Sequence, residues 1–520
     1  MDGAATPTPA KAAPPSRQHG HRLTEGPITA TLFWFSLPIL GSNVLQSLNG
    51  SINAIWVGRF IGEAGITATA NANLVLFFLL GAVFGVGMAG TIMVGQAMGA
   101  KNLDGAKRVV GTSATFFGAV SLAVAVFGYV MSPTILGWFG TPTDAFAMAV
   151  TYLRIIFVAL PALYLNNYTM MILRGAGDAR TPLIFMFVSV VLDAGLNPFF
   201  INGWGPFPRM GIAGSATSTL IGQTVSMFGV LIYLYARRHP LRLVGEELGY
   251  LKPDLQILRT TIVKGLPMGL QMIVISGSAI AVMGMVNAYG VVTAAAYGVG
   301  AQIWTYIQMP AMAIGAAASS MAAQNVGAQQ WPRVELTARS GAIINFFLTG
   351  ALVALVLFAE RPLLELFLPG HPDAIAIASH INRIVAWSFI LFGLTFVLFG
   401  VVRSTGAVMP PLISLAISLL GVRLAFAKLL EPAWGADALW WSFPVSMAVS
   451  VLLAFGYYRW GGWRKARMGP PIRASGEADA TGFATPAMDA MCPEVVEDLG
   501  PERDEDLVAV DGPPRRLEPQ

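Results

Sequence analysis

The sequence has few charged residues, one cysteine and few histidines. Only 12% of its 520 residues are Asp, Glu, Lys or Arg, whereas 55% are hydrophobic. A soluble domain carries about 25% charged residues, so the deficit excludes a large soluble core and indicates a polytopic membrane protein. The single cysteine, Cys492, excludes an internal disulfide and a thiolate metal cluster. We expect no metal site and no cofactor.

The two ends of the chain differ from its middle. Residues 1–26 are rich in Ala and Pro and contain no apolar run, so we do not expect a signal peptide. Residues 470–520 hold 12 acids and 4 arginines among Pro and Gly, which is a composition typical of disordered chain. We expect a disordered N-terminus over 1–26 and a disordered acidic tail over 466–520.

Long hydrophobic segments are abundant. A helix needs about 20 mostly apolar residues to cross a bilayer, and Gly or Pro within such a segment is tolerated. The sequence therefore predicts an all-α integral membrane protein with twelve transmembrane helices. These are expected at 31–57, 66–95, 110–131, 145–172, 181–201, 211–236, 265–287, 294–319, 340–359, 374–402, 410–430 and 438–458.

The distribution of Lys and Arg predicts the orientation in the membrane. If the N-terminus lies inside, the inner segments that flank the spans carry 22 Lys and Arg, and the outer loops carry three. Inner loops of membrane proteins are enriched in these residues. We therefore expect both termini to be cytoplasmic and the protein to lie in the plasma (inner) membrane.

The two halves of the sequence resemble each other at a shift of 229 positions. The shift relates a set of Pro, Arg and Gly pairs: Pro38 and Pro267, Arg154 and Arg383, Arg174 and Arg403, Gly177 and Gly406, and Pro182 and Pro411. Six helices repeated in the same orientation predict two pseudo-symmetric lobes around a central cavity. We place the lobes at 27–236 and 265–465 and the cytoplasmic linker loop at 237–264. Such a pair suits alternating access.

One acid lies deep inside an expected span, in "VVLDAGLNPFFINGWG" (190–205). This acid is Asp193. A charge at mid-helix costs about 2.5–3.5 kcal/mol on insertion scales, unless it faces a cavity or is neutralised by a proton. Asp193 is therefore a candidate proton carrier. The alternative is a structural carboxylate that is hydrogen-bonded between helices.

Several polar residues are candidates to share a pocket with Asp193. Asn197 lies four residues on, on the same helical face, and Asn53 of the first span lies at a similar depth. Further candidates, each of which is also explained as a helix–helix contact, are Asn166, Asn167, Thr217 and Thr219.

The second half carries basic residues at depth instead. These are Arg383, Arg423 and Lys428, and Val422 occupies the repeat position of Asp193. Arg383 has a repeat partner and is interpreted as structural. Arg423 either extends to the outer surface or faces the cavity. The two halves are therefore functionally unequal.

The sequence resembles the multidrug and toxic compound extrusion (MATE) family over about residues 25–465. The resemblance is carried by "SLPIL…INAIWVGR", "GQAMGAKNLDGAKR", "LRGAGDARTP", "LDAGLNPFFI" and "GIAGSATST". It implies a V-shaped pair of six-helix lobes and an antiporter, not an enzyme. Such proteins expel cationic, amphipathic organic compounds in exchange for H⁺ or Na⁺. We expect a monomer in the lipid bilayer, with drug substrates and no nucleic-acid partner.

The match to the family departs at the polar positions. The family commonly has Asp where this chain has Asn53, and its DinF-type branch has Asn followed four residues later by Asp, the reverse of Asp193 and Asn197. The resemblance implies a conformational hinge at Pro38, which is kept. The acids of the sodium-driven branch align with Ile275 and Phe392. This favours protons and places the chain closer to the DinF-type branch.

Three alternatives stay open at this point. One is a sodium-coupled drug antiporter. A second is a lipid-linked oligosaccharide flippase of the wider superfamily, which needs a more cationic cavity than the few central Arg and Lys residues would provide. A membrane-embedded enzyme would need a metal or nucleophile cluster, and His380 is the one histidine in an expected span.

Overall fold

The computed structural model describes residues 23–469. The predicted N-terminal segment up to residue 22, the tail from 470 and Cys492 lie outside the described residues. Within 23–469 every regular element is helical, which confirms the predicted all-α class. Within these residues ten helical segments are long and apolar enough to cross a membrane, and Pro372–Val385 (α11) with Ser388–Arg403 (α12), which are bent by 43° relative to each other, would make an eleventh span.

The first half contains six long helices. They are α1 (Ile28–Phe60), α2 (Glu63–Gly99), α3 (Leu103–Trp138), α4 (Thr143–Gly175), α5 (Arg180–Asn202) and α6 (Ile212–Ala236). Each matches one expected span, and most extend beyond the predicted ends because polar residues continue the helices outside the apolar segments; α6 begins one residue after the predicted 211. Asn102, for example, caps α3 by accepting a hydrogen bond from the Gly105 N–H, eight residues before the predicted start at 110.

The second half is less regular. It comprises α7 (Leu255–Asn287), α8 (Val291–Gly327), α9 (Trp331–Phe358), α10 (Glu360–Phe367), α11 (Pro372–Val385), α12 (Ser388–Arg403), α13 (Met409–Ala416), α14 (Arg423–Trp434) and α15 (Ala436–Trp460). A π-helical turn, η2 (Ile417–Val422), joins α13 to α14. The expected span 374–402 is the bent pair α11 and α12, and 410–430 is interrupted by η2.

Helix α8 corresponds to the expected span 294–319. It is not one of the ten helices that are apolar enough to cross a membrane by composition alone. It is 37 residues long and largely buried by protein. Its polar side chains find partners inside the protein: Gln324 Nε2 donates to the Gly175 carbonyl at 2.9 Å, and Asn325 Nδ2 donates to the Met321 carbonyl at 2.7 Å. Helix α8 therefore serves as a core helix of the second half.

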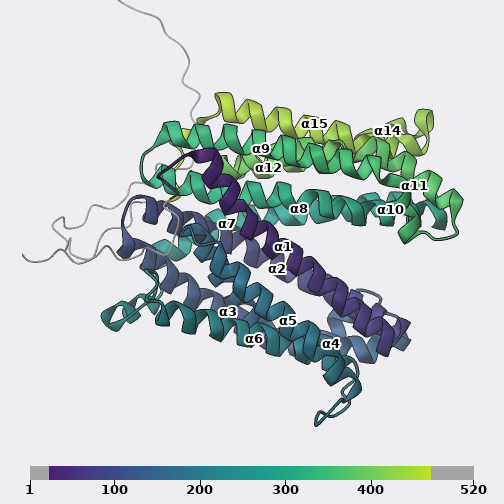
Figure 1. Ribbon diagram of the computed structural model, residues 1–520, viewed down its shortest axis with the longest axis horizontal. Coiled ribbons are helices and arrows are strands. Elements are labelled where there is room, and N and C mark those ends of the chain that lie inside the picture. Colours follow the sequence, from purple (N-terminus) through teal and green to yellow (C-terminus); the bar gives the residue numbers. More distant parts are fainter. Residues whose placement is uncertain (1–22, 470–520) are drawn as a thin grey trace, which may run out of the picture. The chain divides into compact units, whose positions relative to one another are not determined.

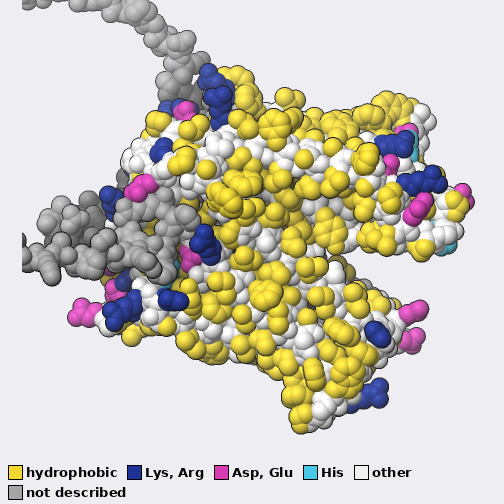
Figure 2. Space-filling view, viewed as in Figure 1, with side chains coloured by type: hydrophobic (Ala, Val, Ile, Leu, Met, Phe, Trp, Pro, Cys, Tyr) yellow, Lys and Arg dark blue, Asp and Glu magenta, His cyan; other side chains and the backbone are white. Residues whose placement is uncertain are grey.

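The helices form two groups, one from each half of the chain (Figure 1). In the first group α4 packs against α2, α3 and α6, and in the second α12 packs against α8, α9 and α15. Both α1 and α2 connect the groups: α1 contacts α5 as well as α8 and α9, and α2 contacts α4 as well as α7 and α8. Figure 2 shows hydrophobic side chains over the flanks and charged side chains gathered at the two ends of the helices. This is the surface of a multi-pass membrane protein.

The segment predicted as disordered over 1–26 is ordered from Leu23. Leu23 is fully buried in a core cluster with residues of α8 and α9, and its carbonyl accepts a hydrogen bond from Asn325 at 3.2 Å. At the other end, Met468 is buried as well, although residues from 466 were predicted to belong to the disordered tail. Both boundaries were wrong by a few residues, because one apolar side chain in each short segment reaches the core.

Two glycines bring the groups together at the end of the helices that carries residues 96–102. A Cβ on Gly99 would lie 1.8 Å from the Gln324 carbonyl oxygen, and one on Gly327 would lie 1.9 Å from the Gln96 carbonyl oxygen. The two contacts are related by the repeat. The charge distribution predicts that this end is cytoplasmic, so the structure is closed on that side.

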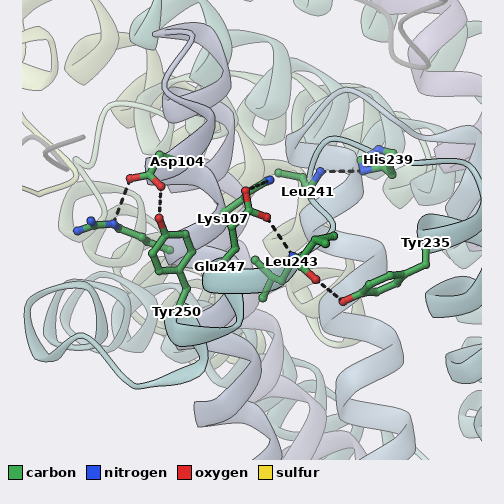
Figure 3. Close-up of polar contacts among 10 residues, drawn as sticks. Asp104, Lys107, Tyr235, His239, Leu241, Leu243, Glu247 and Tyr250 are labelled. Atoms are coloured by element: carbon green, nitrogen blue, oxygen red, sulfur yellow. Dashed lines mark hydrogen bonds and ion pairs between the residues drawn. The ribbon is translucent and has the colours of Figure 1, made fainter. Parts of the chain in front are cut away.

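The linker between the halves is shorter than predicted and is held against α3. Helix α7 begins at Leu255 instead of 265, and a short 3-10 helix, η1 (Gly245–Leu251), precedes it. Figure 3 shows the contact: Lys107 Nζ lies 2.5 Å from Glu247 Oε1, and the Tyr250 hydroxyl donates to Asp104. The hydrogen bond from Lys107 holds the pKa of Glu247 below its ordinary value of 4.5.

Lys107→Ala is expected to loosen the linker. Hydrogen–deuterium exchange of the amides of 244–247 should rise by about fivefold at pH 7, since a partly exposed ion pair contributes up to about 1 kcal/mol. Because the Glu247 pKa is lowered, the pair is formed above about pH 4.5 and is lost as the pH falls below it. Lys101→Ala serves as the control. Equal exchange in the wild type and Lys107→Ala would show that the Lys107–Glu247 ion pair does not hold the linker against α3.

Candidate functional site

Helices α1 and α5 form a two-step polar ladder. Asn49 Nδ2 donates to Asp193 Oδ2 at 2.9 Å, and Asn197 Nδ2 donates to Asn53 Oδ1 at 3.4 Å. Asn49 and Asn53 are four residues apart on α1, as are Asp193 and Asn197 on α5, so each pair shares one face of its helix. The predicted meeting of Asp193, Asn197 and Asn53 is therefore present in the structure.

Helix α6 supplies two hydroxyls to the same cluster. Thr219 Oγ1 lies 3.2 Å from both carboxylate oxygens of Asp193. Ser215 Oγ donates to Asn53 Oδ1 at 2.6 Å. The hydroxyls are four residues apart and so face α5 and α1 together.

Glycines permit this close approach of α6 to α5. A Cβ on Gly214 would lie 2.5 Å from the Phe200 backbone carbon, and one on Gly222 would lie 3.0 Å from the Ser189 carbonyl oxygen. Any larger residue at Gly214 would push α6 away, so the sequence "GIAGSATST" positions Ser215 and Thr219 through the small residue that precedes them.

The carboxylate is buried among neutral partners. Asp193 is 2% exposed, and its partners among the described residues are Asn49, Thr219, Asn197 at 3.5 Å and, electrostatically, Tyr152 of α4. None of them is a cation. Charging this group is therefore costly, and a proton or a bound cation would neutralise it.

The oxygens around Asp193 are those that hold hard cations. The described residues contain no group of three or more His, Cys, Asp and Glu that would suit a transition metal. One carboxylate with the amide oxygens of Asn53 and Asn197 would suit a proton or Na⁺ better than a divalent ion, because a single negative charge is present. Asn197 Oδ1 is buried and has no hydrogen-bond partner within residues 23–469.

Three of the predicted pocket residues lie elsewhere. Asn166 Nδ2 donates to Gln223 at 2.9 Å and to Ser226 at 3.2 Å, which ties α4 to α6. Asn167 Nδ2 and Thr217 Oγ1 donate to carbonyls one turn back in their own helices, each at 2.8 Å. The structure therefore does not bring Asn166, Asn167 or Thr217 to Asp193, whereas Thr219 does reach it.

Three residues of the cluster were not predicted: Asn49, Ser215 and Tyr152. Asn49 could have been found, because its spacing from Asn53 equals the spacing of Asp193 from Asn197. Tyr152 is buried on α4, where its hydroxyl interacts electrostatically with Asp193 and Asn53. No sequence pattern indicated Tyr152, since its contact depends on how α4 packs.

Pro38 interrupts the hydrogen bonds of α1 nearer its start. Proline has no N–H, and the Pro38 carbonyl also accepts a bond from Ser42 Oγ at 2.9 Å. An open pocket of about 450 Å³ lies beside it, lined by residues of α1 and α5 that include Trp34, Arg180 and Leu183. Pro38 is eleven residues from Asn49, or about 16 Å along the helix.

The second half contains no acid at the matching depth. Ile275 and Phe392 belong to a hydrophobic core cluster. Arg383 is paired with Glu360 at 3.3 Å, and Lys428 is exposed. Arg423 does not extend to the surface, because it is only 6% exposed and donates from Nε to Ser446 Oγ at 3.0 Å.

The MatE family model matches this chain twice, over residues 38–199 and 267–429. The chain belongs to the MATE family. Members of this family are membrane transporters, and the two matches begin at Pro38 and Pro267, which the repeat shift of 229 also relates.

Similar MATE proteins extend over most of the chain. "Probable multidrug resistance protein YoeA" of Bacillus subtilis is 35% identical over 84% of this chain and 94% of its own. "Probable multidrug resistance protein YpnP" of the same organism is 30% identical over 86% of this chain and 98% of its own. "Probable multidrug resistance protein NorM" of Thermotoga maritima is 24% identical over 77% and 85%.

Solved structures share the fold. A crystal structure of a MATE protein in complex with MaL6 has a TM-score of 0.78 and 20% identity, and the match covers 85% of this chain and 97% of that one. A mutant of the Vibrio cholerae MATE transporter VcmN has a TM-score of 0.77 and 19% sequence identity, and the match covers 85% of this chain and 98% of that one. These neighbours confirm the predicted fold class of two six-helix lobes.

Proposed function

We propose that this MATE transporter is a multidrug antiporter that exports cationic, amphipathic organic compounds in exchange for protons. The observation that carries the proposal is Asp193: a carboxylate that is 2% exposed and has only neutral partners among the described residues. The relatives named as multidrug resistance proteins support the substrate class. The charge distribution supports a plasma-membrane location with the closed end facing the cytoplasm.

Proton uptake changes the bonding of the ladder. Ionised Asp193 accepts hydrogen bonds from Asn49 Nδ2 and Thr219 Oγ1. Protonated Asp193 carries an O–H, which needs an acceptor, and Asn197 Oδ1 one turn away lacks a partner among the described residues. A new bond to Asn197 would weaken the bond to Asn49. Protonation would thereby loosen α1 from α5.

This change connects the proton to α1. Helix α1 contacts α5 of the first half and α8 and α9 of the second half. A loosened outer part of α1 would bend at Pro38, where one backbone hydrogen bond is missing. Protonation would also remove the negative charge that attracts an organic cation. The drug would then leave on the outer side, and coupling arises because drug and proton favour different states.

Sodium is the competing ion, since Asp193, Asn53 and Asn197 offer oxygen ligands. A comparison of imposed gradients in proteoliposomes distinguishes the two. We expect a fluorescent cationic dye to move when only a pH gradient is present, and a protonophore to stop it. Movement driven by a sodium gradient at uniform pH would contradict proton coupling.

Asn49→Leu is expected to lower the initial rate of proton-driven dye movement about tenfold or more. The variant removes the 2.9 Å bond to Asp193, and a bond to a charged group contributes about 1.5–3 kcal/mol. The matched control is Asn167→Leu, because the side-chain hydrogen bond of Asn167 within residues 23–469 goes to its own helix. We expect the control to retain most of the rate. Equal losses in both variants would show that Asn49 has no special part in coupling.

A further inference from the structure

The second half holds a buried guanidinium that the proposed function does not use. Arg423 is the first residue of α14 and follows the π-helical turn η2 directly. A π-helical turn changes the face on which the following residues lie, and such turns are frequent at functional sites. Arg423 consequently points into the protein and is only 6% exposed.

The contacts of Arg423 satisfy only part of its guanidinium. Nε donates to Ser446 Oγ at 3.0 Å, and Cζ lies 4.3 Å from the centre of the Phe443 ring. Ser446 in turn donates to the Phe443 carbonyl at 2.9 Å, so its hydroxyl fixes the guanidinium in place. Nη2 is buried and has no hydrogen-bond partner in the part of the chain that the structure describes.

A second buried donor without a partner lies on α15, one turn from Ser446. Ser450 is 1% exposed, and its Oγ also lacks a hydrogen-bond partner within the described residues. It follows Ser446 by four residues on α15, so the two hydroxyls share a helix face and their Cβ atoms are about 6 Å apart. Two buried donors on adjacent helices, one of them charged, are thus left unsatisfied.

No carboxylate among the described residues neutralises Arg423. Glu360, the buried acid of this half, is bonded to Ser379, Asn382 and Arg383. Glu431 of α14 accepts a hydrogen bond from Tyr289. Arginine stays charged in proteins, and a buried charge without a counter-charge is strongly unfavourable. The Phe443 ring attracts the face of the cation but leaves its N–H edge free.

We propose that Arg423 and Ser450 bind a small monovalent anion, such as chloride, between α14 and α15. Nη2 supplies charge and a donor, Ser450 supplies a neutral donor, and Ser446 with Phe443 orients the guanidinium. The donors are buried, which selects an inorganic ion over an organic acid. The anion would neutralise the buried charge of Arg423, as a proton would neutralise Asp193 in the first half.

Thermal unfolding of the purified full-length protein tests this site. At equal ionic strength, replacing sodium gluconate by sodium chloride at about 0.3 M should raise the Tm by about 2–4 °C. Arg423→Met should remove the chloride response, and Ser450→Ala should raise the chloride concentration needed for it about tenfold. Arg154→Met is the matched control, because Arg154 also lies over an aromatic ring, Tyr129 at 5.2 Å, but is partly exposed. It should keep the full response.

A measurement on the wild type covers the case in which Arg423→Met does not fold. Equilibrium binding of radioactive chloride should saturate at one ion per chain, and bromide should compete. Absence of saturable binding, or a Tm that is equal in chloride and gluconate, would overturn the proposal. A full chloride response in folded Arg423→Met would overturn it as well. Drug transport by Asp193 does not enter any of these readouts.

Discussion

Asp193→Asn is expected to abolish proton-driven dye efflux in proteoliposomes, with a fall in initial rate of about 100-fold or more. The variant has nearly the shape of protonated aspartic acid but cannot release a proton. The described helices offer no second acid at this depth to replace it, because Ile275 and Phe392 are apolar. Proton flux, followed with an internal pH dye, should fall together with dye movement.

Binding of the dye distinguishes loss of coupling from loss of fold. Wild-type protein should bind a cationic dye more weakly as the pH falls, because protonation removes the negative charge of Asp193. Asp193→Asn should bind with a constant affinity across that range. Normal exchange of dye for protons by the variant would show that Asp193 is not the carrier.

The double variant Asp193→Asn with Asn197→Asp asks whether the position of the acid matters. It moves the carboxylate by one turn, about 6 Å, from Asn49 to the step of the ladder that contains Asn53. Asn197 is fully buried, so the moved acid would still be enclosed. We expect transport to recover to within about tenfold of the wild type, since both steps join α1 to α5. No recovery would assign the coupling to the step at Asn49.

The sequence alone predicted the twelve spans and the meeting of Asp193, Asn197 and Asn53. Both follow from local rules: about 20 apolar residues cross a bilayer, and residues four apart share a helix face. The similar depth of Asn53 in α1 and of Asp193 and Asn197 in α5 then predicted that these side chains meet.

What the sequence could not predict is the rotation of each helix about its axis. Thr217 and Thr219 are two residues apart, so they point about 200° apart on α6 and only one of them can face α5. The choice depends on the packing of Gly214 against Phe200. Tyr152 reached the site for the same kind of reason, through the packing of α4.

Local rules also could not predict the irregular helices of the second half. The bend of 43° between α11 and α12 contains no proline. The bend is instead surrounded by contacts with other helices. Asn382 of α11 accepts a hydrogen bond from Trp304 Nε1 at 3.0 Å and donates one to Glu360 at 3.1 Å. The π-helical turn before Arg423 has no sequence signal either, and it decides that Arg423 points inward.

The double variant Gly99→Ala with Gly327→Ala is expected to hold the transporter open at the end that now is closed. Each added Cβ would lie within 2 Å of a backbone oxygen, that of Gln324 or that of Gln96. A clash with backbone cannot be relieved by a rotamer change, so the two groups of helices must separate there. Separation also breaks two bonds related by the repeat, from Gln96 Nε2 to the Ser404 carbonyl at 2.6 Å and from Gln324 Nε2 to the Gly175 carbonyl at 2.9 Å.

Thiol labelling reports this opening, because the sequence has one cysteine, Cys492. With Cys492→Ser and Ala97→Cys, the new thiol lies at a position that is 6% exposed in the closed structure. The double glycine variant should raise its labelling rate about tenfold or more and abolish dye efflux, since a shift of the equilibrium by 1.4 kcal/mol is already tenfold. Gly118→Ala is the control, because nothing lies within 4 Å of its added Cβ. Retained dye binding would show that the variant is folded. Unchanged labelling together with normal efflux would mean that the glycine contacts do not close this end during transport.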